Sequence, residues 1–198
     1  MSRRTNTISE ILIPSADELE EELNRVQHRK KYMGVLRSTV FTLVSAAAVV
    51  VLVCMLVLPV LRIYGSSMEP TLHDGDIVVC LKNGKFQSKD LIGFYYNNKI
   101  LVKRVIAGSG DWVYMDDRGN VTVNDVRVAE PYVTEKSRGE CDLDFPYQVP
   151  ENRLFVMGDH RKTSIDSRSS VVGCAAEEQV VGKILFRIWP LDRMGRVN

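Results

Sequence analysis

The longest apolar stretch of the chain lies near its N-terminal end. Ser38 to Leu61 contains no charged residue, is almost wholly apolar from Val40 onward, and has one proline, Pro59, near its end. As a helix this stretch would span about 36 Å, at about 1.5 Å per residue, which is enough to cross a bilayer core of about 30 Å. A surface helix packed on a core would show a polar face, and no such face is visible here. The pattern therefore predicts a transmembrane helix over residues 38–61.

The flanks of this segment predict its orientation. Arg62 alone follows it, whereas five basic residues precede it: Arg25, Arg29, Lys30, Lys31 and Arg37. The positive-inside bias places residues 1–37 in the cytoplasm and residues 62–198 outside the cell. A cleaved secretory signal would have a shorter leader and an apolar core of only about 7–15 residues. We therefore expect a retained signal-anchor that crosses the cell membrane once and contacts the lipid bilayer.

A second helical pattern precedes the anchor, over Asp17–Met33. Leu19, Leu23, Val26 and Met33 recur at three-, four- and seven-residue spacing. Acidic residues gather near the start of this segment and basic ones near its end, as the helix dipole favours. It is either a solvated juxtamembrane helix, or a contact for a partner helix or anionic lipid. Residues 1–16 are expected to be unstructured.

The rest of the chain, residues 62–198, has the short apolar and alternating patterns of strands. Turn signals separate them at Asp74-Gly75, Asn83-Gly84, Gly108-Ser109-Gly110 and Arg118-Gly119-Asn120. The strands expected are Asp76–Leu81, Leu91–Tyr96, Ile100–Ala107, Trp112–Met115, Val121–Val123, Arg153–Val156 and Val180–Ile188. Residues 132–150 are polar and are expected to form a long loop. This segment is therefore predicted to be a mainly β, antiparallel, barrel-like domain.

Composition excludes several classes of function. Lys+Arg 26 against Asp+Glu 25 leaves the chain nearly neutral, so it gives no reason to expect nucleic acid as a partner. No CxxC or HExxH motif is present, and neither a metal site nor an organic cofactor is expected. The cysteines outside the anchor are odd in number, so a Cys141–Cys174 disulfide and free buried thiols both stay open; the set is Cys54, Cys80, Cys141 and Cys174.

Candidate nucleophiles and bases narrow the possible chemistry. The histidines are His28, His73 and His160; His28 lies on the predicted cytoplasmic side, and neither of the others stands in a recognisable triad context. A Ser-Lys pair needs no histidine, but its lysine must be neutral near pH 7, which burial can achieve. On a strand, Lys103 would share a face with Leu101 and Val105. The alternative is an edge lysine that reaches water.

The serine candidate lies in the segment Gly65-Ser66-Ser67-Met68-Glu69-Pro70-Thr71-Leu72. Taken alone, this segment could equally be an ordinary linker. Together with Lys103-Arg104-Val105-Ile106 and the run Gly158-Asp159-His160-Arg161-Lys162-Thr163-Ser164-Ile165-Asp166-Ser167-Arg168, it resembles the three signature blocks of bacterial type I signal peptidases. The blocks stand in the family's order behind a membrane anchor. The resemblance covers about residues 35 to 190.

The resemblance implies a site and a mechanism. Ser67 would be the nucleophile, Lys103 the general base and later the general acid, and Ser164 the group that orients the lysine amine. Supporting ion pairs would be Asp166 with Arg168 and Asp159 with Arg104. An extended strand would place Ser164 and Asp166 on one face. Where some relatives have a serine oxyanion donor, this chain has Gly65, so the oxyanion hole would rest on the backbone N–H of Ser67 and one further donor.

The resemblance also implies a substrate. Exported preproteins would be cut behind their signal peptides, after small residues in the A-x-A pattern, near the secretion translocon. The implied fold has an apolar face directed at the membrane. Walls for the two shallow substrate pockets are expected from residues near Ile63, Met68, Leu101 and Val102.

Three other interpretations stay open on the sequence. A self-cleaving repressor or mutagenesis protein uses a similar Ser-Lys pair, but it would be soluble. An inactive membrane-anchored scaffold of the same fold would be expected to lose the serine or the lysine, and this chain keeps both. A specialised peptidase for one surface protein, such as a pilin, would share every motif described above.

Overall fold

The computed structural model describes residues 15–82 and 85–197, and the chain divides into two compact units, residues 1–52 and 53–198. The prediction that residues 1–16 are unstructured is therefore not tested for residues 1–14. The predicted Asn83-Gly84 turn also lies outside the described residues. Ala16, which was expected to be unstructured, is instead the first residue of the helix.

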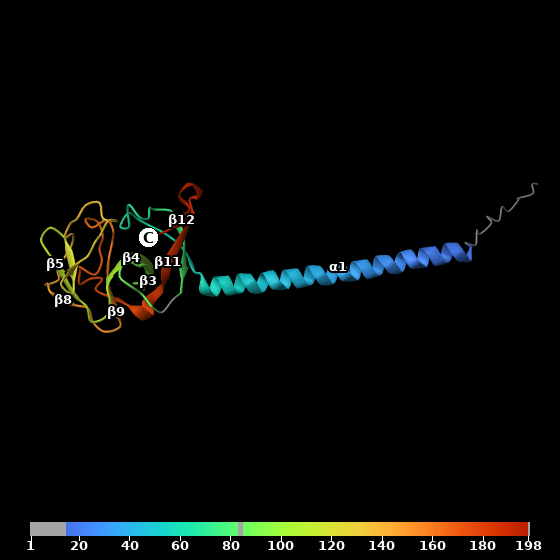
Figure 1. The fold of residues 1–198 in the computed structure, drawn as a ribbon, viewed down its shortest axis with the longest axis horizontal. Coiled ribbons are helices and arrows are strands. Elements are labelled where there is room, and N and C mark those ends of the chain that lie inside the picture. Colours follow the sequence, from blue (N-terminus) through green and yellow to red (C-terminus); the bar gives the residue numbers. More distant parts are fainter. Residues whose placement is uncertain (1–14, 83–84, 198) are drawn as a thin grey trace, which may run out of the picture. The chain divides into compact units, whose positions relative to one another are not determined.

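One continuous helix, α1 (Ala16–Val57), contains the predicted segment 17–33 and all but the last four residues of the predicted segment 38–61, and it is long and apolar enough to cross a membrane (Figure 1). Ser15 and Glu18 form a reciprocal capping box at its start, with the Glu18 N–H donating to Ser15 Oγ and the Ser15 N–H to the Glu18 carboxylate. The helix ends four residues before the predicted limit of the apolar segment, because Pro59 disfavours helical backbone at Leu58.

The second unit is built from two antiparallel sheets. In the larger sheet the strand order is β1-β2-β11-β3-β4-β9-β10, with β12 paired to β11; in the smaller it is β7-β6-β5-β8. The larger sheet contains β1 (Val60–Arg62), β2 (Ile77–Leu81), β3 (Leu91–Tyr96), β4 (Lys99–Ala107), β9 (Arg153–Met157), β10 (Ala175–Ala176), β11 (Val180–Trp189) and β12 (Gly195–Arg196). The smaller contains β5 (Trp112–Met115), β6 (Val121–Val123), β7 (Val126–Arg127) and β8 (Tyr147–Gln148). Two 3₁₀ turns, η1 (Glu177–Gln179) and η2 (Leu191–Arg193), flank β11.

The structure confirms the mainly β, antiparallel prediction and all seven predicted strands, with their ends displaced by no more than one residue. It adds β1 and the two-residue strands β7, β8, β10 and β12, which no sequence pattern had indicated. An extended strand would place Ser164 and Asp166 on one face, but these residues lie in an irregular loop after β9. The predicted loop over 132–150 is irregular except at β8.

The buried side chains fix the strands that carry the site. Val113, Met115 and Val121 of the smaller sheet pack with Ile106 and Phe155 of β4 and β9. A second cluster lies around β2, and a third joins apolar residues of β3, β4 and β9, among them Ile92, Phe94, Val105, Leu154 and Val156. Strand β4 is therefore packed from Lys103 onward on both faces, whereas its first two residues are exposed.

Candidate active site

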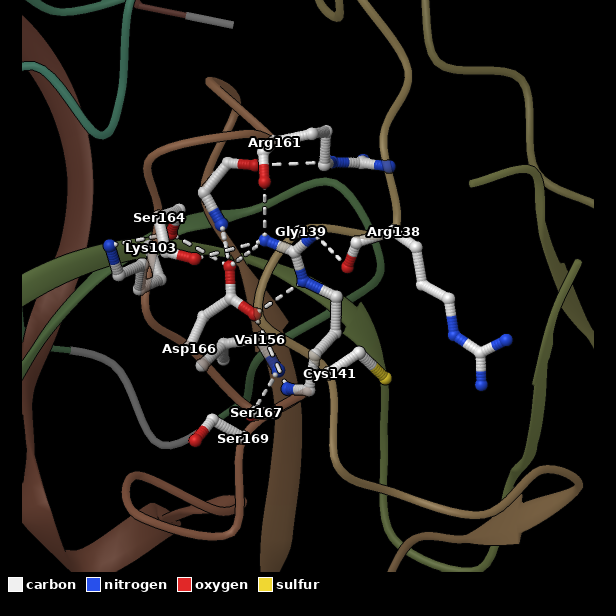
Figure 2. Close-up of polar contacts among 12 residues, drawn as sticks. Lys103, Arg138, Gly139, Cys141, Val156, Arg161, Ser164, Asp166, Ser167 and Ser169 are labelled. Carbon is white, nitrogen blue, oxygen red and sulfur yellow. Dashed lines mark hydrogen bonds and ion pairs between the residues drawn. The ribbon is translucent and has the colours of Figure 1, made fainter. Parts of the chain in front are cut away.

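Lys103 stands between two serine hydroxyls. Its Nζ lies 2.9 Å from Ser67 Oγ and 2.9 Å from Ser164 Oγ. Lys103 comes from β4, Ser67 from the loop that follows β1, and Ser164 from the loop after β9. Figure 2 shows Lys103 and Ser164 facing each other. Three segments far apart in the sequence thus bring two hydroxyls within hydrogen-bond distance of one amine.

Burial lowers the pKa of the Lys103 amine. Leu101, Lys103 and Val105 share a face of β4, as their spacing predicted, and Ile92 of β3 lies directly opposite Lys103. Lys103 is only 4% exposed, and this burial lowers the pKa of its amine to about 8, with Arg168 lowering it further and Asp166 and Asp159 opposing. A substantial fraction of the amine is therefore neutral near physiological pH. The edge-lysine alternative does not hold.

The orientation of Ser164 comes from a buried carboxylate. Ser164 Oγ donates to Asp166 Oδ2 at 2.7 Å. Because a hydroxyl has one proton, Ser164 Oγ is left to accept from the lysine. The lone pair of a neutral Lys103 amine then remains available for the proton of Ser67.

Asp166 is ionised despite its burial. Burial raises the pKa of Asp166, but the hydrogen bonds and charge of Arg168, with hydrogen bonds from Gly158 and Ser164, outweigh it and hold this pKa below its ordinary value. Arg168 binds the carboxylate with two nitrogens, Nε to Oδ1 at 2.8 Å and Nη2 to Oδ2 at 2.9 Å. Such a forked pair fixes the plane of the carboxylate.

Gly158 lets the two serine loops approach each other, a role that the sequence had not assigned. A Cβ at this position would lie 2.6 Å from the Ser67 carbonyl oxygen and would overlap the Ser164 side chain. The Gly158 N–H donates to Asp166 Oδ2 at 2.9 Å. The Ser67 carbonyl accepts the N–H of His160 at 3.1 Å, which ties the loop after β1 to the same segment.

Arg104 and Asp159 form a second buried pair beside the site, with distances of 2.8 and 2.7 Å. Thr71 Oγ1 donates to Asp159 at 2.5 Å, and the Arg104 guanidinium lies 3.9 Å from the centroid of the Tyr132 ring. Thr71 and Tyr132 were missed because neither contact is local in sequence. The Arg104–Asp159 pair and its contact with Thr71 therefore join the loop after β1, strand β4 and the loop after β9.

An open cleft of about 750 Å³ leads to Ser67 and Lys103. The four residues expected as pocket walls all line it: Ile63, Met68, Leu101 and Val102. Apolar residues that the sequence had not singled out extend it, namely Val60, Leu61, Tyr64, Tyr95 and Ile100. Its lining is mixed but mainly apolar.

Within the described residues, the Ser67 hydroxyl, the Lys103 amine and the Ser164 hydroxyl make no hydrogen bond to a cysteine or histidine side chain. All four cysteines are free, so the Cys141–Cys174 disulfide that the sequence left open is not formed. Burial raises the pKa of the Cys80 thiol to about 12, which makes it inert. Across residues 15–82 and 85–197, His, Cys, Asp and Glu form no cluster that could hold a metal ion.

Comparison with known proteins gives consistent matches. A family model described as "Signal peptidase, peptidase S26" matches residues 36–189. The chain is 32% identical over 180 residues to a signal peptidase I of Bacillus licheniformis, covering 82% of this chain and 95% of that protein. It is 36% identical over 143 residues to signal peptidase I T of Bacillus subtilis (strain 168), covering 66% of this chain and 73% of that protein. A crystal structure of a signal peptidase I from Enterococcus faecalis V583 is 27% identical and covers 50% of this chain and 96% of that one, with a TM-score of 0.42.

Proposed function

Because the chain belongs to the signal peptidase family, peptidase S26, we propose that it is a membrane-anchored serine endopeptidase that removes signal peptides from exported preproteins. The observation that supports this most directly is the buried Lys103 amine, 2.9 Å from the Ser67 hydroxyl. A serine is a weak nucleophile until a base takes its proton, and this amine is the base within reach.

The reaction is an acyl transfer in two stages. Neutral Lys103 accepts the proton of Ser67 as Oγ attacks the carbonyl carbon of the scissile bond. The resulting ammonium gives its proton to the leaving amine, so that the mature protein departs and an ester on Ser67 remains. Lys103, neutral again, accepts a proton from water that attacks the ester. The bond between the acyl carbon and Ser67 Oγ then breaks, the Lys103 ammonium returns its proton to Oγ, and the signal peptide leaves with a free carboxyl group.

Substrate choice is assigned to the cleft. Small residues at the first and third positions before the cut would fit against Ile63, Met68, Leu101 and Val102, which line it. Cleavage after an A-x-A pattern follows from that fit. Neither a metal ion nor an organic cofactor is required by this scheme.

The proposed function places the enzyme at the cell membrane. Helix α1 would anchor the chain with residues 1–37 in the cytoplasm and the β domain outside. An exposed apolar surface on and after β11 would contact the bilayer; it contains Phe186, Ile188, Trp189, Leu191 and Met194. Signal peptides emerging from the bilayer near the translocon would then meet the cleft.

The test uses the full chain in detergent and a preprotein with an A-x-A site. Wild type is expected to cut after the second alanine, as read by mass spectrometry, whereas Ser67→Ala and Lys103→Ala are expected to lose cleavage by a factor of at least ~10³. Ser66→Ala and Lys162→Ala change an adjacent serine and a nearby exposed lysine, and both should cut normally. Cleavage that survives in both site variants would overturn the assignment of the Ser-Lys pair. An inactive wild type would contradict the proposal and favour a scaffold or a specialised substrate.

A further inference from the structure

The segment Glu130–Gly139, called the strap from this point, connects β7 to the region before β8 and lies outside the three signature blocks. We propose that Gly139 is a positioning residue for catalysis, because its missing side chain lets the strap hold the Arg168 guanidinium against Asp166. This inference rests on the proposed function, since it concerns the same Ser-Lys site.

Arg168 connects the strap to the base. Its Nη1 donates to the carbonyls of Ser137 and Arg138, at 3.2 and 2.8 Å, while Nε and Nη2 hold Asp166. Figure 2 shows Gly139, the Arg138 carbonyl and Asp166 grouped around this guanidinium. The backbone of the strap therefore holds the Arg168 guanidinium through Nη1, and the guanidinium holds the Asp166 carboxylate through Nε and Nη2.

Gly139 is where the strap comes nearest to Arg168. Its φ of +60° lies in the left-handed region, and a Cβ there would lie 2.6 Å from the Arg161 carbonyl oxygen and 2.7 Å from Arg168 Nη1. Arg168 is fully buried, so its guanidinium has no solvent into which it could move. A side chain at 139 must displace either the strap or the guanidinium.

The strap itself is held at several points. Arg161 and Glu130 form an ion pair at 2.5 Å with both side chains fully buried. Lys136 donates to Asn120, and a Cβ on Gly119 would lie 2.7–2.8 Å from the backbone of Ser137. Because the strap is fixed against the β5–β6 turn in this way, the displacement caused by a side chain at 139 falls on Arg168.

Displacing Arg168 changes both the geometry and the charge around Lys103. The carboxylate of Asp166 would lose its forked partner, and Ser164 would no longer hold the amine in line with Ser67. The charged groups that act on Lys103 are Arg168, which lowers its pKa, and Asp166 and Asp159, which raise it. With Arg168 farther away, the lysine holds its proton to higher pH.

The experiment compares matched glycine variants of the full chain in detergent on the same preprotein. Gly139→Ala is expected to lower kcat by ~10-fold or more, with little change in KM, and to move the rising limb of the pH–rate profile to higher pH. Gly139→Asn adds the same Cβ, but asparagine tolerates the left-handed backbone better, so it should fold more readily and give the same shift.

Gly173→Ala is the control. Gly173 has a φ of +62°, almost identical to that of Gly139, but a Cβ there meets nothing within 4 Å. It is expected to share the backbone strain and to keep the wild-type kcat and pH limb. If Gly139→Ala and Gly139→Asn keep the wild-type kcat and pH limb, or if Gly173→Ala shows the same shift, the positioning role is overturned. An inactive wild type would instead overturn the proposed function.

Discussion

At the scale of single residues, the proposed chemistry depends on one buried amine that must lose a proton. Lys103 shares its face of β4 with Leu101 and Val105, its amine contacts two serine hydroxyls, and its exposed fraction is 4%. Desolvation disfavours the ammonium, whereas Asp166 and Asp159 favour it; the first effect is the larger. Ser164 and Asp166 also fix the position of the amine, because Ser164 Oγ accepts a hydrogen bond from Lys103 and donates one to Asp166.

The pH dependence of cleavage follows from this residue. Because the neutral amine is the active form in the proposed mechanism, kcat/KM of the wild type is expected to rise with pH through a midpoint near the lysine pKa of about 8. Initial rates on one preprotein between about pH 6 and 10 measure this midpoint. Lys103→Arg, which keeps a proton at all these values, should be inactive throughout. A midpoint near about 6.5, the ordinary pKa of histidine, would point to a histidine base.

At the scale of elements, the loops between the strands carry buried charge that must stay paired. The strap places Glu130 against Arg161, and both side chains are fully buried. Arg161 Nε also donates to the Gly158 carbonyl at 3.1 Å. Removal of the carboxylate would leave a guanidinium without its counter-charge in the interior.

Glu130→Ala is therefore expected to lower the free energy of unfolding by about 3 kcal/mol. Urea unfolding of the full chain in detergent, followed by tryptophan fluorescence, measures the change. Asp117→Ala removes another carboxylate paired with the strap, but that side chain is 95% exposed, so the stability should hardly change. Equal effects of the two substitutions would contradict the assigned importance of the buried pair.

At the scale of the whole molecule, the chain combines one long helix with an apolar half and one β domain. In the function proposed above, the helix anchors the chain and the β domain, which contains Ser67, Lys103 and Ser164, carries out the chemistry. The basic residues before the apolar half of the helix predict that the β domain lies outside the cell.

This orientation predicts a protease-protection pattern. With epitope tags at both ends, a protease added to intact spheroplasts should remove the C-terminal tag and leave the N-terminal tag on a short membrane fragment. After lysis both tags should be lost. Protection of the C-terminal tag in intact spheroplasts would show the opposite orientation.

The sequence by itself determined the elements whose signals are local. The uncharged run and the pattern over residues 17–33 predicted the helix, and short apolar or alternating runs predicted the seven strands. The Ser15–Glu18 cap is also a local signal, but the prediction did not include it. Even the end of the helix at Val57 had a local signal in Pro59. Local patterns were sufficient here because helix and strand periodicity depend on neighbours within a few residues.

Only the tertiary structure decided the rest. The two-residue strands are too short to show an alternation of apolar and polar residues, and they form because a partner strand lies beside them. Ser164 meets Asp166 through a loop rather than a strand. The contact of Arg168 with Arg138 joins residues 30 positions apart. Such hydrogen bonds form only where packing brings buried polar groups together, because an unpaired buried group is costly, and a pattern of neighbouring residues does not contain that information.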